Sequence, residues 1–249
     1  KFILHSNDCS RSDPRCHIMK DDKEEKVQGV FQRISGNYDI MNDIISIGLH
    51  RGWKDSLADE ISQRGKCILD VCCGTGDLTV MLSKKDSSNE VTGLDFSQNM
   101  LSVAKERVSK NEIKNVELIQ GNAMDLPFED NRFDCAVISF GLRNVADYSK
   151  VISEMTRVIK KGGWVYCLEA SYPDSKYIKP FFRLYFRYIM PRLAGLITGK
   201  QKEYEWLNES TELFLKKDEL ADLFKECGLA NVSYKTYLLG SAALHKGQK

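Results

Sequence analysis

The sequence feature that most constrains the fold is an alternation, beginning after Gly65, between short apolar runs and segments with helical spacing. Such an alternation is typical of β-α-β units, in which parallel strands are joined by helices that cross over the sheet. The apolar runs predict five strands, at residues 67–71, 90–94, 116–120, 135–140 and 164–169. Because residues 68–69 and 136–138 are continuously apolar, we expect both faces of the sheet to be covered by helices.

Helix-spaced apolar residues lie between the predicted strands at 78–83, 100–109 and 151–158. We expect Gly162 and Gly163 to end the last of these helices before the fifth strand. Near the C-terminus a helical stripe ends at Gly228, and two further strands, 231–237 and 241–245, flank a short link. A link this short joins antiparallel neighbours, since a parallel crossover needs a dozen or more residues. The prediction is an α/β, Rossmann-like, mostly parallel seven-stranded sheet with a C-terminal antiparallel hairpin.

The domain organisation follows from the same patterns. Residues 1–26 show no sustained period, and we interpret them as a flexible leader or an extension. Residues 27–249 form one predicted domain, which fits a chain of 249 residues. Within it, 27–64 is a helical entry section, and 171–215 is an insertion that interrupts the alternating pattern.

Composition excludes several classes of protein. The 36 Lys and Arg residues against 35 Asp and Glu residues give a net charge of +1, which provides no general attraction for nucleic acid. No apolar stretch approaches the roughly 18–20 residues that cross a bilayer, and the N-terminal residues lack the apolar core of a secretory signal. We therefore expect a cytoplasmic protein. Its eight cysteines contain no Cys-x-x-Cys and its four histidines are scattered, so we expect reduced thiols and no metal site.

A glycine-rich turn gives the first indication of a ligand. Residues 70–77, Asp-Val-Cys-Cys-Gly-Thr-Gly-Asp, follow the first predicted strand and open a helix, where Rossmann-like folds bind nucleotides. Asp95 ends the second strand nineteen residues after Gly76, a position from which a carboxylate binds ribose hydroxyls. The dinucleotide-binding pattern has Gly or Ala at the position that Thr79 occupies in this chain. In addition, the negative charges of Asp70 and Asp77 would repel a pyrophosphate. A cationic adenosine compound without phosphate, S-adenosylmethionine, fits this turn better.

These residues resemble the donor-binding core of class I S-adenosylmethionine-dependent methyltransferases. Further motifs resemble the quinone-biosynthesis C-methyltransferase family: Val-Phe-Gln-Arg-Ile-Ser at 30–35, Tyr-Asp-Ile-Met-Asn at 38–42, Gly-Asn-Ala-Met-Asp-Leu-Pro-Phe at 121–128 and Gly-Leu-Arg-Asn-Val at 141–145. Within that family, Tyr-Phe-Arg-Tyr-Ile-Met-Pro at 185–191 and Tyr-Glu-Trp-Leu at 204–207 are most similar to the demethylmenaquinone methyltransferase branch from Gram-positive bacteria. The resemblance covers roughly residues 27–249 and implies the class I methyltransferase fold.

The resemblance also implies the cofactor and its site. The cofactor is S-adenosylmethionine, with Asp95 on the ribose, Asn122 and Ala123 beside the adenine, and Asp70 facing the amino-acid part. The full implied set of cofactor-binding residues is Asp70, Gly74, Thr75, Gly76, Asp95, Asn122, Ala123 and Ser139. The implied reaction is methylation of a ring carbon of a prenylated quinol, demethylmenaquinol to menaquinol.

Three residues are the family-matched catalytic candidates: Tyr38, Arg143 and Asn144. An arginine does not give up its proton near neutral pH, so we assign Arg143 to stabilising a developing phenolate or orienting a water. Asn144 and the Tyr38 hydroxyl complete this hydrogen-bond set. His50 and His245 each stand alone in sequence, and we expect capping or packing rather than catalysis from them.

The insertion predicts the environment of the acceptor. Seven aromatic residues between Tyr172 and Tyr188 are interleaved with lysines and arginines. This composition suits a helical subdomain packed on the sheet, and it also suits a surface that touches an anionic membrane or walls an apolar channel. We expect transient contact with the inner face of the cell membrane as a peripheral protein, and a homodimer is compatible with the sequence.

Other functions stay open at this stage. They are methylation of a benzoquinol in the ubiquinone pathway, methylation of a small soluble acceptor or of oxygen, donor binding without catalysis in a membrane-associated complex, and an NAD-dependent oxidoreductase. Thr79, Asp70 and Asp77 count against the last of these. Tyr38, Arg143, Asn144 and the aromatic insertion favour methylation of a quinol carbon over methylation of a small soluble acceptor or of oxygen.

Overall fold

The computed structural model describes residues 48–173 and 210–249 continuously. It also describes eleven single residues: Asp43, Ser46, Ser175, Tyr177, Pro180, Phe182, Leu184, Tyr185, Tyr188, Arg192 and Gly195. Predictions for the leader 1–26, for Tyr38, for the first part of the entry section and for most of the insertion lie outside the described residues.

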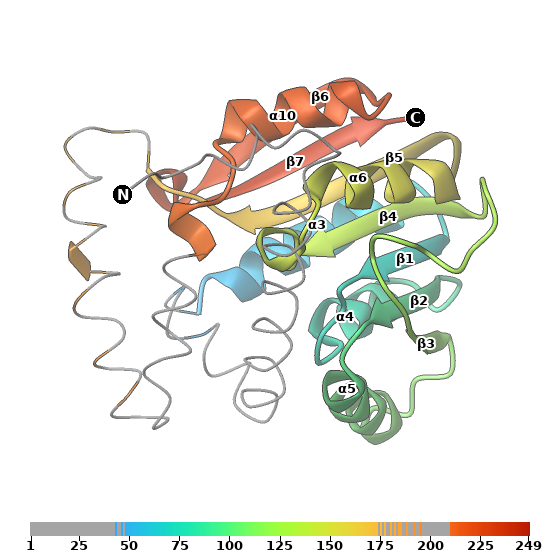
Figure 1. Cartoon of the computed structure of the whole chain (residues 1–249). Helices are drawn as coiled ribbons and strands as arrows, with labels where there is room; N and C mark the ends of the chain where they lie inside the picture. The colour runs from blue at the N-terminus through green and yellow to red at the C-terminus, as the bar shows by residue number, and fades with distance from the viewer. Residues whose placement is uncertain are drawn as a thin grey trace, which may run out of the picture.

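The described chain forms one seven-stranded sheet in the order β3-β2-β1-β4-β5-β7-β6 (Figure 1). The strands are β1 Cys67–Val71, β2 Glu90–Asp95, β3 Val116–Gln120, β4 Phe133–Ser139, β5 Ile159–Ala170, β6 Ala230–Tyr237 and β7 Ala242–Gln248. The first five strands pair in parallel, and β7 runs antiparallel to both β5 and β6. The predicted fold, including its C-terminal hairpin, is confirmed.

Five α-helices and two short 3₁₀ turns complete the described elements. They are α3 His50–Ser62, α4 Asp77–Lys85, α5 Gln98–Lys110, α6 Tyr148–Val158 and α10 Lys217–Glu226, with the turns η2 Leu142–Asn144 and η4 Leu238–Gly240. Two of these helices begin at a capping side chain: Ser97 accepts a hydrogen bond from Met100 N, and Asp147 accepts one from Lys150 N. These caps fix where α5 and α6 start.

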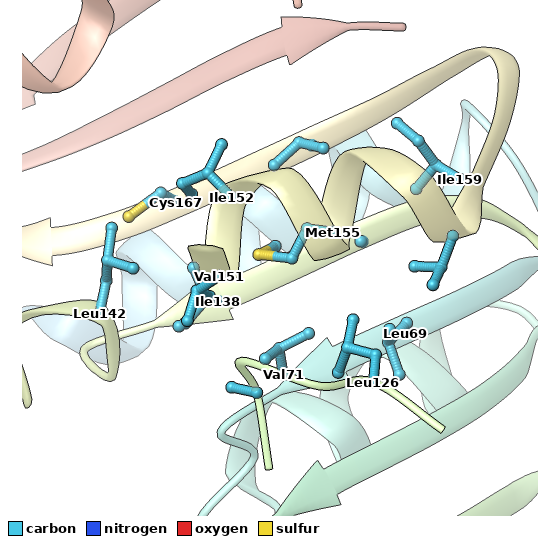
Figure 2. Packing of buried hydrophobic residues seen from close by; sticks show 14 of the residues in the cluster. Leu69, Val71, Leu126, Ile138, Leu142, Val151, Ile152, Met155, Ile159 and Cys167 are labelled. Atoms are coloured by element: carbon cyan, nitrogen blue, oxygen red, sulfur yellow. The ribbon is translucent and has the colours of Figure 1, made fainter. Parts of the chain in front are cut away.

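The helices cover both faces of the sheet. On one face, apolar residues of α3 and α4 pack against β1, β2 and β4. On the other face, Val151, Ile152 and Met155 of α6 lie over β1, β4 and β5 (Figure 2), and Phe224 of α10 belongs to the same cluster. The sheet therefore has a hydrophobic core on each face, and this explains why its central strands are apolar at nearly every position.

One local prediction was wrong. Gly162 and Gly163 do not end a helix, because α6 already ends at Val158 and β5 begins at Ile159. The two glycines lie instead in an irregularity of β5, where the pairing with β4 shifts register. Gly162 has φ of 81°, and a Cβ on Gly163 would lie 2.5 Å from the carbonyl oxygen of Asp134. Glycine is needed there for backbone conformation and close strand approach.

The strand order determines where a ligand can bind. In sheets of this kind the chain crosses over in opposite directions from β1 and from β4, which opens a crevice at the carboxyl ends of these neighbouring strands. The loops after β1, β2, β3 and β4 all leave the sheet at this edge. All the predicted site residues that the structure describes lie on these loops or at these strand ends.

Candidate functional site

The glycine turn after β1 is shaped by left-handed backbone conformations. Cys72, Gly74 and Gly76 have φ values of 55°, 56° and 76°. A Cβ on Gly76 would lie 3.0 Å from Cβ of Ala104 on α5, so the turn also packs tightly against the next helix. The intervening Thr75 is buried. The turn is thus held close to the sheet edge by backbone geometry that glycine allows.

Asp95 at the end of β2 fastens the glycine turn. One carboxylate oxygen accepts a hydrogen bond from Gly74 N at 2.9 Å, and the other accepts one from Ser97 N at 2.9 Å. Burial raises the pKa of Asp95, while these two backbone donors lower it. Each oxygen retains a lone pair, so this carboxylate can still accept hydrogen bonds from a pair of hydroxyls.

Asp70, the penultimate residue of β1, is a buried carboxylate with a single side-chain partner among the described residues. Thr79 Oγ1 donates a hydrogen bond to Asp70 Oδ2 at 2.6 Å. Burial raises the pKa of Asp70 to about 7, although the hydrogen bond from Thr79 and the charge of Lys54 act in the opposite direction. Thr79, which the sequence marked only as a departure from the dinucleotide pattern, therefore has a role in orienting Asp70.

Asn122 and Ala123 lie just beyond β3. Gly121 N donates to Asp95 O at 3.1 Å, which ties this loop to the end of β2. Asn122 Oδ1 accepts from Met124 N at 2.9 Å, whereas Ala123 is buried in the core. The loop therefore presents an exposed amide beside a small apolar residue, a suitable environment for one edge and one face of an aromatic base.

The chain after β4 touches the glycine turn. Phe140 adopts φ of 57°, and a Cβ on Gly141 would lie 2.7 Å from Cβ of Cys72. Ser139, the last residue of β4, has a buried hydroxyl with no hydrogen-bond partner among the described residues. Two loops that are distant in sequence are thus in direct contact, with an unpaired hydroxyl beside them.

Arg143 and Asn144 lie in the turn η2 that follows. The Arg143 guanidinium is buried and forms an ion pair with Glu169, and its Nη1 also donates to Phe140 O at 2.7 Å. Glu169 further accepts from Arg143 N at 3.2 Å and from Ala170 N at 2.8 Å. Glu169 was missed by sequence reasoning, although a carboxylate near the end of an otherwise apolar buried strand was a signal for it.

Three buried polar atoms at this edge lack a partner among the described residues: Ser139 Oγ, Arg143 Nε and Asn144 Nδ2. Unpaired buried donors are costly, and they are characteristic of a site that a polar ligand completes. Two are N–H donors directed from one short turn, next to the glycine turn and the acidic groups. The residues present fit a ligand with a cationic group on the acidic side and a hydroxyl or anionic oxygen on the Arg143 side.

Lys54 of α3 was not predicted from sequence as a site residue. Its buried Nζ lies 3.0 Å from Asp77 Oδ2 and 5.7 Å from the centre of the Phe140 ring. Arg107 Nη1 lies 3.6 Å from Asp77 Oδ1. Burial opposes ionisation of Asp77, but Lys54 and Arg107 outweigh it and lower its pKa. Asp77 is therefore neutralised by protein cations and is not a free negative charge for a ligand.

The two histidines pack as expected. His50 Nδ1 lies 2.7 Å from Ser46 Oγ, and burial lowers its pKa. His245, on β7, has its Nε2 2.8 Å from Lys217 O at the start of α10, and burial lowers the pKa of His245 to about 4. A histidine that stays neutral in a packed environment is a poor proton acceptor near pH 7.

The described residues of the insertion are of two kinds. Phe182 packs edge-on against Tyr172, with ring centroids 5.5 Å apart. Tyr177, Leu184 and Tyr188 have exposed side chains. Within the described parts of the chain, no helix is long and apolar enough to cross a membrane, and no group of three His, Cys, Asp or Glu side chains is arranged to hold a metal ion.

Residues 19–249 match the ubiE/COQ5 methyltransferase family. Two curated relatives, from Bacillus cereus (strain ATCC 10987 / NRS 248) and Bacillus pumilus (strain SAFR-032), are both called demethylmenaquinone methyltransferase. Each is 48% identical over 233 residues, which is 93% of this chain and 98% and 100% of the relatives, respectively.

Solved structures share the fold. A SAM-dependent methyltransferase from Thermotoga maritima matches with a TM-score of 0.61 at 18% identity, covering 90% of this chain and 99% of that one. A SAM-dependent methyltransferase from Aquifex aeolicus matches with a TM-score of 0.56 at 18% identity, covering 78% and 88%. At this level of identity, the similarity establishes the architecture alone.

Proposed function

Because the chain belongs to the ubiE/COQ5 methyltransferase family, we propose that it methylates a ring carbon of demethylmenaquinol with S-adenosylmethionine as the methyl donor. The observation that carries this function is the 48% identity over 93% of the chain to demethylmenaquinone methyltransferases. When bound, S-adenosylmethionine supplies an electrophilic methyl group on a positively charged sulfur.

The donor-binding role of the first three loops is supported by their contacts. Asp95 holds the glycine turn through Gly74 N and keeps acceptor capacity for the ribose hydroxyls. Ala123 and Asn122 supply an apolar contact and an amide for the adenine. Asp70 faces the ammonium end of the donor, and the hydrogen bond from Thr79 orients its carboxylate.

The acceptor must become nucleophilic at carbon, which requires its ring hydroxyl to lose a proton or share it strongly. Arg143 stabilises the resulting phenolate, since a guanidinium keeps its proton near neutral pH. Its Nη1 is already engaged by Glu169 and Phe140, whereas its buried Nε has no partner among the described residues and is a donor available for this task. Asn144 Nδ2 adds a second donor, and Tyr38, outside the described residues, completes the set.

The tail of the acceptor implies contact with a membrane. A prenylated quinol resides in lipid, and the exposed side chains of Tyr177, Leu184 and Tyr188 in the insertion supply apolar and aromatic surface for its interface. We expect replacement of Arg183 and Arg187 by Glu to reduce sedimentation with anionic liposomes. Unchanged sedimentation would refute docking through the insertion.

One experiment tests the reaction. The protein is incubated with donor carrying a labelled methyl group and a reduced demethylmenaquinone analogue, and the label is located by mass spectrometry and NMR. We expect the label on the ring carbon, and we expect Arg143→Ala to abolish transfer while donor binding persists. A label on oxygen, no transfer to the quinol, or normal turnover of Arg143→Ala would contradict the corresponding part of the proposal.

A further inference from the structure

Lys54 is a buried lysine whose hydrogen-bonding capacity is largely unused. Its side chain is 6% exposed, although lysine is among the residues least often buried. An ammonium carries three N–H donors, and among the described residues Asp77 Oδ2 is the one acceptor bonded to Lys54 Nζ. A buried ammonium with open donor positions is costly unless another acceptor completes it.

The position of Lys54 places these open donors at the ligand crevice. Its Nζ lies between Asp77, the first residue of α4, and the ring of Phe140, just beyond β4. The start of α4 and the chain that follows β4 border the crevice between the carboxyl ends of β1 and β4. Lys54 is also close enough to Asp70 for its positive charge to act on that carboxylate. Lys54 is therefore on the same side of the site as the proposed contact for the ammonium of the donor.

The charges around Lys54 favour an additional anion. The carboxylate of Asp77 is shared between Lys54 and Arg107, so it does not belong to Lys54 alone. The next acidic group, Asp70, is hydrogen-bonded to Thr79 and has no hydrogen bond with Lys54. The site consequently has one ammonium that is incompletely paired, next to a carboxyl group that suits a cation.

We propose that Lys54 binds the α-carboxylate of S-adenosylmethionine. The amino-acid end of this donor carries an ammonium and a carboxylate on the same carbon, so it needs neighbouring protein groups of opposite sign. Asp70 and Lys54 are such a pair. This inference rests on the proposed donor but not on the acceptor, and it adds a ligand-binding residue from α3 to a site otherwise built from loops at the sheet edge.

The test compares two ligands in two variants. Affinities of the full chain for S-adenosylmethionine and for decarboxylated S-adenosylmethionine, which keeps the ammonium and sulfonium, are measured by calorimetry without acceptor. Lys54→Met keeps the apolar stem and removes the charge. We expect it to weaken S-adenosylmethionine binding about 10- to 100-fold, the worth of one charge-assisted hydrogen bond, and to change binding of the decarboxylated ligand less than threefold.

A matched control is Lys85→Met. Lys85 also connects α4 to α3, through Asp55 and Asp59, but it lies at the far end of α4 from the glycine turn. This variant should leave both affinities unchanged. The ratio of the two affinities within one protein does not depend on its overall stability, so modest destabilisation by Lys54→Met does not affect the result.

The outcomes separate this inference from the proposed function. Equal losses for both ligands, or no loss for either, would overturn the role of Lys54 while leaving quinol methylation intact. A selective loss together with no transfer to the quinol would support Lys54 and contradict the acceptor. No binding of S-adenosylmethionine by the unmodified chain would overturn both.

Discussion

Asp70 makes the stability of the unliganded protein depend on pH in a direction opposite to that of an ordinary surface carboxylate. Burial raises its pKa from 3.8 to about 7, so the folded state holds a proton that the unfolded state releases. Stability from this group is therefore complete below pH 3.8 and is lost as pH rises towards 7. Replacing Asp70 by Asn removes the ionisation while keeping an oxygen that accepts from Thr79.

The magnitude follows from the two pKa values. At about 1.4 kcal/mol per unit, ionisation of Asp70 costs the unliganded protein about 4 kcal/mol at pH 8 and about 1.5 kcal/mol at pH 5. The free energy of unfolding of Asp70→Asn, relative to that of the unmodified protein, should therefore rise by about 2–3 kcal/mol from pH 5 to pH 8. Any pH-independent cost of burying the second amide donor cancels in this difference.

Urea unfolding of both proteins at pH 5 and pH 8, followed by circular dichroism, measures this difference directly. If donor binding requires ionised Asp70, the affinity of the unmodified protein should also rise up to about tenfold from pH 6 to pH 8, and that of Asp70→Asn should stay constant. Parallel pH profiles of stability for the two proteins would refute the reasoning, because they would mean that Asp70 ionises in the folded protein at its ordinary pKa.

Three further changes test the fold around the site. Burial lowers the pKa of His245 to about 4, so stability that is present above pH 6.5 is lost as pH falls, by about 2 kcal/mol between pH 7 and pH 5. His245→Gln should remove this loss when the free energy of unfolding is measured by urea titration. An unchanged dependence of that free energy on pH would contradict the prediction. Leu239 is 70% exposed with φ of 57°, so Leu239→Asn should raise the free energy of unfolding by about 0.5–1 kcal/mol, whereas Leu213→Asn, 67% exposed without positive φ, should not. Gly141→Ala should lower stability by more than about 1 kcal/mol because its Cβ would meet the glycine turn, whereas Gly52→Ala, in open helical space, should raise it by about 0.5–1 kcal/mol; thermal melts that rank these two variants the other way would contradict the geometry.

The strands were predictable because short apolar runs alternate with helical spacing, and in the central strands β1 and β4 burial on both faces makes those runs nearly continuous. The boundaries of β1 and β3 agree with the predicted 67–71 and 116–120, and β6 differs by one residue. The prediction failed at Gly162 and Gly163, where a glycine pair has two meanings in a sequence. Both a helix end and a strand irregularity need positive φ or close approach, and the choice depends on the neighbouring strand.

The arrangement of the loops that we propose to bind the donor was predictable for a related reason. Glycines and a carboxylate at fixed spacing after consecutive strands reflect local chain geometry, and Asp95 indeed binds the turn through Gly74 N. Glu169 and Lys54 were not predictable, because their partners lie 26 and 23 residues away in sequence and are brought together by the tertiary fold. Ion pairs between elements distant in sequence have no periodic pattern to indicate them.

The structure also changes the electrostatic account of the donor site. The sequence placed Asp70, Asp77 and Asp95 together and predicted an acidic pocket for a cationic ligand. In the folded protein, Asp77 is neutralised by Lys54 and Arg107, and Asp70 has a pKa of about 7. A strongly acidic pocket would attract the ammonium and the sulfonium of the donor but would repel its carboxylate. A site in which Asp70 ionises near neutral pH, next to an incompletely paired Lys54, can match both charges of an amino acid at once. Selectivity for the intact amino-acid end, rather than attraction of any cation, is the property that this arrangement of charges favours.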